Sequence, residues 1–135
     1  MLSRKGKTEQ GTVSEAPFAV AQRDHDRRTS VISVQGELDV STAPKLKWAL
    51  QDSVQDGHSQ LVVDLSLTSF MDSTALGVLI GVKRGLPAGA QMAIVCDAPS
   101  ILYVFEVSGM DGAFSIYATL QDALATIPTS AAEVG

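Results

Sequence analysis

The part of the chain best suited to chemistry is a short segment of three consecutive residues of the types that begin helices. Asp72, Ser73 and Thr74 lie between an apolar run that ends at Leu65 and a second apolar run at residues 78–80. Asp, Ser and Thr are preferred at helix starts. A serine hydroxyl at the positive end of a helix suits reversible phosphorylation, because the helix dipole and free backbone N–H groups stabilise a phosphate there.

Phosphorylation would change the charge of this segment without requiring the domain to unfold. A phosphate adds about −1.5 to −2 charge, here next to Asp72. Ser73 is the preferred acceptor, and Thr74 is the alternative, because the β-branched Thr74 hydroxyl is expected to cap the helix. A second interpretation stays open at this point: all three residues could serve only as helix caps.

Enzymatic chemistry has little support in the sequence. A triad of Ser73, His58 and Asp64 can be imagined, but no Gly-x-Ser-x-Gly elbow surrounds Ser73. His25 and His58 are predicted to be isolated in turns, without a second ligand at metal spacing. The chain has no phosphate-binding loop of the Gly-x-x-x-x-Gly-Lys-Ser/Thr type. We therefore expect a protein that is not an enzyme and that has no metal and no cofactor.

Alternating strands and helices are predicted to position the segment. We expect strands at residues 18–22, 30–35, 60–65, 91–96 and 114–117. Helices are expected from a cap at Ser41 or Thr42 to about residue 56, and over 73–84, 99–107 and 120–127. The turn at residues 36–39 is expected to break the second strand. This order predicts an α/β domain with a mixed four- to five-stranded sheet, an opening hairpin and about four covering helices.

Composition limits the partners and the compartment. The 135 residues carry a net charge of −5, and the 10 Lys and Arg are scattered, so we expect no binding to nucleic acid and no direct membrane binding. No apolar stretch approaches the roughly 20 residues that span a bilayer, and the N-terminus has no secretory signal, so we expect a cytoplasmic protein. The single cysteine, Cys96, excludes an internal disulfide and is expected to be a buried thiol.

Three groups of residues together resemble a known family. They are the turn Gly36-Glu37-Leu38-Asp39, the strand end Val63-Asp64-Leu65 and the segment Phe70-Met71-Asp72-Ser73-Thr74-Ala75-Leu76-Gly77. They are similar to the STAS domain, and in particular to the bacterial anti-sigma-factor antagonists. The resemblance covers residues 17–127. Residues 1–16 are expected to form a disordered arm and residues 128–135 a flexible tail.

The resemblance implies a regulator of transcription, in stress responses among others, that works by switching partners. The unphosphorylated form would bind an anti-sigma factor that is also a serine kinase, and thereby release a sigma factor. Phosphorylation of the serine after the aspartate, here Ser73, would end binding, and a PP2C-type phosphatase would reset the protein. One departure from the family stands in the motif, because Ala75 replaces the usual glycine and adds a methyl group where a partner's surface is expected.

The partner-binding surface implied by the resemblance combines the turn at Asp39 with the segment that begins at Phe70. Its residues are Asp39, Phe70, Met71, Asp72, Ser73, Thr74 and Ala75. Asp39 can equally serve only to shape its turn, and Phe70 and Met71 can serve in packing. Two other roles of STAS domains remain as alternatives: the scaffold of a sensory assembly, and a small subunit of a membrane transport system. A monomer or a weak dimer is expected.

Overall fold

The computed structural model describes residues 17–127, so the predicted arm and tail lie outside the described residues. The elements alternate in the predicted order. They are β1 (Ala19–Asp24), β2 (Thr29–Leu38), α1 (Ala43–Gln55), β3 (Gln60–Met71), α2 (Ser73–Arg84), β4 (Gln91–Val95), α3 (Pro99–Val107), β5 (Ser115–Tyr117) and α4 (Leu120–Ala125). None of the helices within this range is long and apolar enough to span a bilayer.

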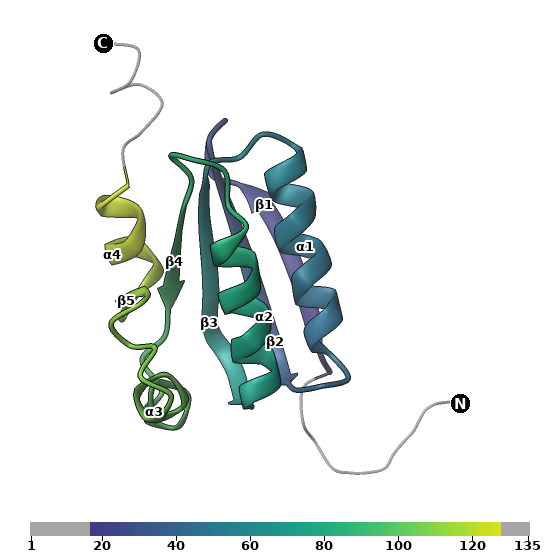
Figure 1. The fold of residues 1–135 in the computed structure, drawn as a ribbon, viewed down its shortest axis with the longest axis vertical. Helices are drawn as coiled ribbons and strands as arrows, with labels where there is room; N and C mark the ends of the chain where they lie inside the picture. Colours follow the sequence, from purple (N-terminus) through teal and green to yellow (C-terminus); the bar gives the residue numbers. More distant parts are fainter. Residues whose placement is uncertain (1–16, 128–135) are drawn as a thin grey trace.

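The five strands form one mixed sheet in the order β1-β2-β3-β4-β5 (Figure 1). β1 and β2 form the expected antiparallel hairpin, and every later pair is parallel. The hairpin turn is held by Asp26, whose Oδ1 accepts hydrogen bonds of 2.8 Å from the N–H groups of both Arg28 and Thr29. The predicted fold class is therefore confirmed.

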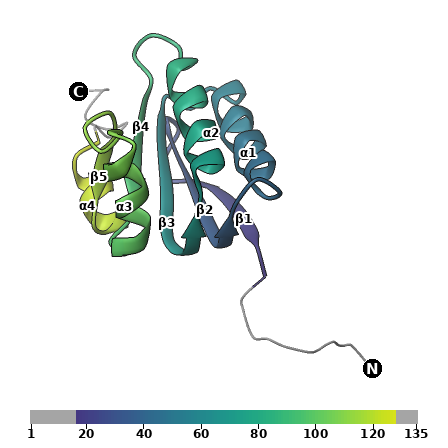
Figure 2. The same cartoon turned by 60° about the horizontal axis from the view of Figure 1, so that its bottom comes forward.

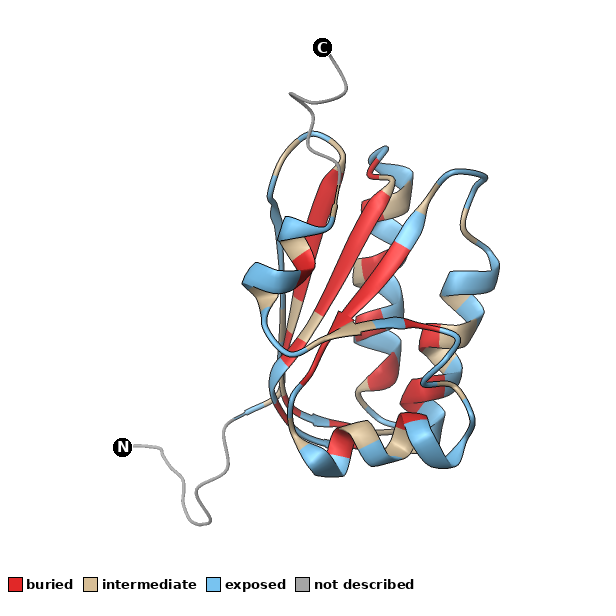
Figure 3. Cartoon of the chain, turned by 90° about the vertical axis from the view of Figure 1, so that its left-hand side faces the viewer, coloured by how far each residue is buried: buried red, intermediate tan, exposed pale blue. Residues whose placement is uncertain are grey.

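The strands alternate their side chains between two apolar layers, as the period of two in a strand requires. Ile32, Val63 and Ile94 belong to the larger core, which also holds the buried apolar residues of α1, α2 and α3. Their neighbours on the opposite face form a smaller cluster beneath α4, made of Val31, Val62, Val95 and Ala123. The helices are visible around the sheet in Figure 2, and the buried central strands in Figure 3.

The expected break at residues 36–39 is wrong, because β2 continues to Leu38. β3 also continues beyond its predicted end, and Leu38 pairs with Met71. Two register shifts place extra residues in β3, so the pairing survives as a bulged ladder. Gly36 permits this course: its φ is +95°, and a Cβ there would lie 3.0 Å from the Phe18 Cα. The glycine therefore allows a close approach within the strand and does not end it.

Candidate functional site

The ends of β2 and β3 bring the Asp39 turn and the start of α2 together. Both strands end at the same edge of the sheet because they run parallel. The backbone N–H of Asp72 donates a hydrogen bond of 3.1 Å to the carbonyl of Leu38, which directly precedes Asp39. Two segments that are more than thirty residues apart in sequence thus form one continuous surface, at the edge where α2 begins (Figure 1).

Ser73 is the first residue of α2, and its side chain is exposed. Asp72 is the N-cap, and its Oδ1 accepts a 3.1 Å hydrogen bond from the Ala75 N–H. The Ser73 hydroxyl makes no hydrogen bond with any residue of the described range. The N–H groups of Ser73 and Thr74 lie in the first helical turn, where no intrahelical acceptor is available. The exposed Ser73 side chain therefore lies next to backbone N–H groups that have no acceptor within the helix.

The predicted capping role of Thr74 is wrong, because Asp72 caps the helix. Thr74 is exposed and lies in a groove between α1 and α2. The groove has a volume of about 430 Å³, and its floor on the α2 side includes Gly77 and Gly81. Lys47 and Gln51 line it from α1. The groove extends the surface of the site along α2.

Asp39 organises its own turn through its carboxylate. Its Oδ1 accepts hydrogen bonds from the Ser41 hydroxyl (2.7 Å), the Ser41 N–H (2.9 Å) and the Thr42 N–H (3.2 Å). These bonds, that from the Ser41 hydroxyl above all, lower the pKa of the Asp39 carboxyl from its usual 3.8. Thr42 occupies the N-cap position of α1, but its hydroxyl donates to the Glu37 carbonyl instead of capping the helix. Asp39 is therefore ionised and fixed at neutral pH.

The structure separates the exposed candidates of this surface from the buried ones. Met71 is 3% exposed and Ala75 is 0% exposed, so both belong to the core beneath the surface. The extra methyl group of Ala75 consequently packs inward, contrary to the expectation that it faces a partner. Phe70 is 48% exposed. Val40 is 68% exposed in the Asp39 turn, although the surface predicted from the sequence did not include it. The one feature of the sequence that could have indicated its exposure is an apolar residue inside a polar turn.

The imagined Ser73, His58 and Asp64 triad does not exist in the structure. His58 lies two residues before β3 and Ser73 two residues after it, so the two lie at opposite ends of the strand. The expectation of an isolated His58 is also wrong: its Nδ1 lies 3.1 Å from the Ser53 carbonyl oxygen, and its Nε2 lies 2.9 Å from Asp24 Oδ1. Within residues 17–127, no three His, Cys, Asp or Glu residues cluster as metal ligands.

The mixed sheet with this strand order, and the helix that begins at Ser73 after the third strand, have the fold of solved anti-sigma factor antagonist structures. Residues 20–123 match the model of the STAS domain family, and the chain belongs to that family. The predicted family is thus confirmed.

Particular relatives are named for their part in sigma-factor control. The chain is 30% identical over 107 residues to the anti-sigma-F factor antagonist RsfB of Mycobacterium tuberculosis, a match that covers 79% of this chain and 87% of that protein. The crystal structure of an anti-sigma factor antagonist from Mycobacterium paratuberculosis has a TM-score of 0.79 and 34% identity, covering 86% of this chain and 100% of that one.

A third similar structure is that of the Bacillus cell fate determinant SpoIIAA in its phosphorylated form. Its TM-score is 0.64 and its identity 27%, over 79% of this chain and 97% of the other. The names of these relatives describe regulatory antagonists and cell fate determinants, not enzymes. This agrees with the expectation that the chain is a regulatory binding protein.

Proposed function

We propose that this protein is an anti-sigma-factor antagonist that is switched by phosphorylation of Ser73. In the unphosphorylated form it binds an anti-sigma factor serine kinase in the cytoplasm and so releases a sigma factor. A PP2C-type phosphatase restores the binding form. The observation that carries the proposal is the exposed Ser73 hydroxyl, which makes no hydrogen bond within the described chain and lies beside Asp72 at the first position of α2. The existence of SpoIIAA structures in both phosphorylated and unphosphorylated forms supports it.

The proposed partner surface consists of the exposed part of the site. It contains Val40 and Phe70 as apolar contacts, and Ser73 and Thr74 as hydrogen-bonding groups. The groove between α1 and α2 continues it. The carboxylates of Asp39 and Asp72 give the surface a negative charge, so a complementary partner presents cationic or N–H groups around an apolar centre. Met71 and Ala75 support this surface from the core.

Phosphorylation would act on this surface through charge. The N–H groups in the first turn of α2 can hold a phosphate, so the fold is expected to survive the modification. The dianion would stand beside the Asp72 carboxylate, and a partner that fits the unmodified surface would have to desolvate both. A penalty of about 2–3 kcal/mol would weaken binding by one to two orders of magnitude. That change is large enough for a switch between partners.

The test measures binding of the cognate kinase to the wild-type protein and to three variants. We expect Ser73→Ala to bind irrespective of ATP, and Ser73→Glu to bind at least about tenfold more weakly. Gln55→Glu, which adds the same charge at the far end of α1, is the matched control and should bind normally. With ATP, the wild-type protein should gain about 80 Da, mapped to Ser73. Equal affinity of all forms would refute the proposal and favour the scaffold or transport roles.

A further inference from the structure

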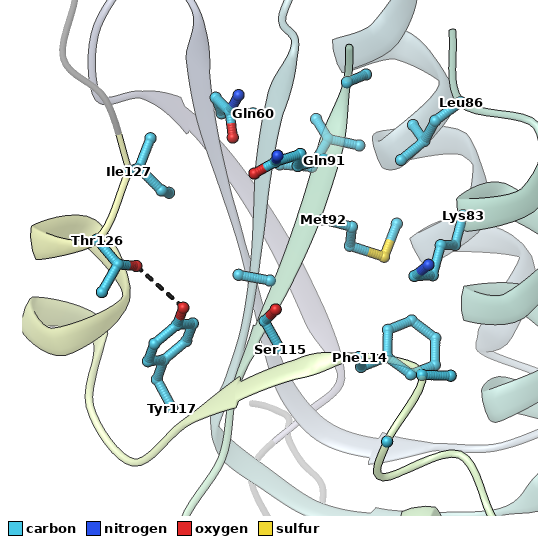
Figure 4. A pocket seen from close by; sticks show the side chains of 15 residues that line it. Gln60, Lys83, Leu86, Gln91, Met92, Phe114, Ser115, Tyr117, Thr126 and Ile127 are labelled. Atoms are coloured by element: carbon cyan, nitrogen blue, oxygen red, sulfur yellow. Dashed lines mark hydrogen bonds between the residues drawn. The ribbon is translucent and has the colours of Figure 1, made fainter. Parts of the chain in front are cut away.

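A second pocket, whose lining side chains are drawn in Figure 4, lies at the end of the sheet opposite the Asp39 turn. Its volume is about 350 Å³, and it lies where β3 and β4 begin. β5 has only three residues and pairs with Ala93–Val95 of β4. The first two residues of β4, Gln91 and Met92, therefore have no pairing partner in β5. The pocket occupies the space that a longer β5 would fill. This volume falls within the range of sites for small molecules.

The wall of this pocket contains a nearly buried glutamine whose amide has no partner within the described chain. Gln60 is 6% exposed, and its side-chain amide makes no hydrogen bond with any residue of the described chain. It is the register partner of Gln91 on the neighbouring parallel strand, so the two amides lie side by side on the same face (Figure 4). The Gln60 amide is not among the fully buried side-chain polar groups that lack a hydrogen-bond partner within the described residues, so it still reaches the open space of the pocket. A ligand could therefore take the place of water at this amide.

The polar side chains that line the pocket on the same side of β4 as Gln60 and Gln91 are all neutral. Besides the two glutamines they are the hydroxyls of Ser115, Tyr117 and Thr126; Thr126 donates a 3.1 Å hydrogen bond to the Tyr117 oxygen. The one charged lining residue among those described, Lys83, lies across β4, with its Nζ 6.0 Å from the centroid of the Phe114 ring (Figure 4). A charged ligand beside the glutamines would leave water without a counter-charge, which is unfavourable.

We propose that this pocket binds a small, uncharged, planar molecule that carries an imide or a cyclic urea group. Two neighbouring amides present N–H donors and C=O acceptors side by side, which is the pattern that complements an imide. The Tyr117 ring and the Ile127 side chain provide apolar walls for a flat ring. The proposal is independent of the proposed function, because the pocket is distant from Ser73. Lys83, which lines the pocket, follows Ser73 by ten residues, or about 15 Å, along α2.

The test is an NMR titration of the full ¹⁵N-labelled chain with hydantoin, a small cyclic imide. We expect saturable shifts of the side-chain amide signals of Gln60 and Gln91. The N,N′-dimethyl derivative of hydantoin keeps the carbonyl groups but lacks N–H donors, and it should bind about tenfold more weakly. Gln60→Met should lose about tenfold in affinity, whereas Gln22→Met, on the opposite edge strand β1, should not. If Gln60→Met does not fold, Gln91→Met replaces it.

Three results would overturn the proposal. They are the absence of saturable shifts, equal binding of hydantoin and its dimethyl derivative, and unchanged binding by a folded Gln60→Met or Gln91→Met. Benzoate is the charged comparison probe. If benzoate binds and hydantoin does not, Lys83 governs the pocket and the argument from neutral groups is wrong. None of these results bears on Ser73, so the failure of this proposal and of the proposed function can be told apart.

Discussion

Two exposed glycines inside α2 allow a quantitative test of the structure. Gly77 and Gly81 lie on the groove between α1 and α2, and a Cβ built on either meets no atom within 4 Å. Glycine inside a helix is about 1 kcal/mol less favourable than alanine. We therefore expect Gly77→Ala and Gly81→Ala each to raise the free energy of unfolding by about 0.5–1 kcal/mol. For a domain of this size the midpoint temperature should rise by about 4 °C per kcal/mol.

Gly57→Ala is the matched control, because it has the same free space but a different backbone conformation. Gly57 is exposed, and no atom lies within 4 Å of its Cβ position, yet its φ is +96°. Alanine is strained in that conformation, so we expect Gly57→Ala to lower the free energy of unfolding by about 1 kcal/mol. The opposite signs at Gly77 and Gly57 would separate backbone conformation from packing.

The assay is urea denaturation followed by far-ultraviolet circular dichroism. The variants are compared only if the dependence of the free energy of unfolding on urea concentration (the m-value) is the same in each. A destabilised Gly77→Ala, or a neutral Gly57→Ala, would refute the reasoning. Gly77→Ala also tests the proposed partner surface, since its methyl group enters the groove beside Thr74. We expect Gly77→Ala to bind the kinase more weakly although it is more stable. Unchanged affinity would exclude the groove from the interface.

Three further predictions concern residues near the site and in the core. Ala75→Gly should lower the free energy of unfolding by about 1–2 kcal/mol, because it removes a buried methyl group and weakens the helix, and a urea titration showing no loss would contradict this. Ser41→Ala should raise the pKa of Asp39 toward 3.8 in an NMR carboxyl titration, since the Ser41 hydroxyl is the main group that lowers it. The stabilisation from Asp39 is present above pH 3.8 and is lost as the pH falls through the lower folded pKa; an unchanged pKa in Ser41→Ala would contradict the assignment. Burial, with a smaller effect of Asp97, raises the pKa of the Cys96 thiol above 9.0, so a thiol reagent at pH 8 should react only after unfolding; rapid reaction of the native protein would show that Cys96 is accessible.

Local patterns in the sequence determined the order of the elements and several of their ends. The helices at 73–84 and 99–107 begin and end at the predicted residues, because caps, prolines and glycines act within one turn of the chain. The continuous apolar runs likewise predicted the buried central strands and the buried Cys96. These features depend on neighbours in sequence, which is why sequence reasoning reached them.

Strand lengths depended on pairing partners that the sequence does not reveal. Gly36 looks like a strand end when read locally. In the fold, β2 and β3 continue side by side to Leu38 and Met71, because each strand satisfies the backbone groups of the other. The capping of α2 was also a matter of geometry: Asp72 and Thr74 are both suitable types, and the backbone placed the Asp72 carboxylate on the Ala75 N–H.

The sequence by itself determined the family, the fold class and the residue types of the candidate site. Only the tertiary structure decided which of those residues face outward. It joined the Asp39 turn to the start of α2 and sent Met71 and Ala75 into the core. It buried His58 against Ser53 and set the amides of Gln60 and Gln91 side by side. The reason is physical: burial and long-range contact follow from the register of parallel strands whose connections are whole helices, and no local pattern encodes that register.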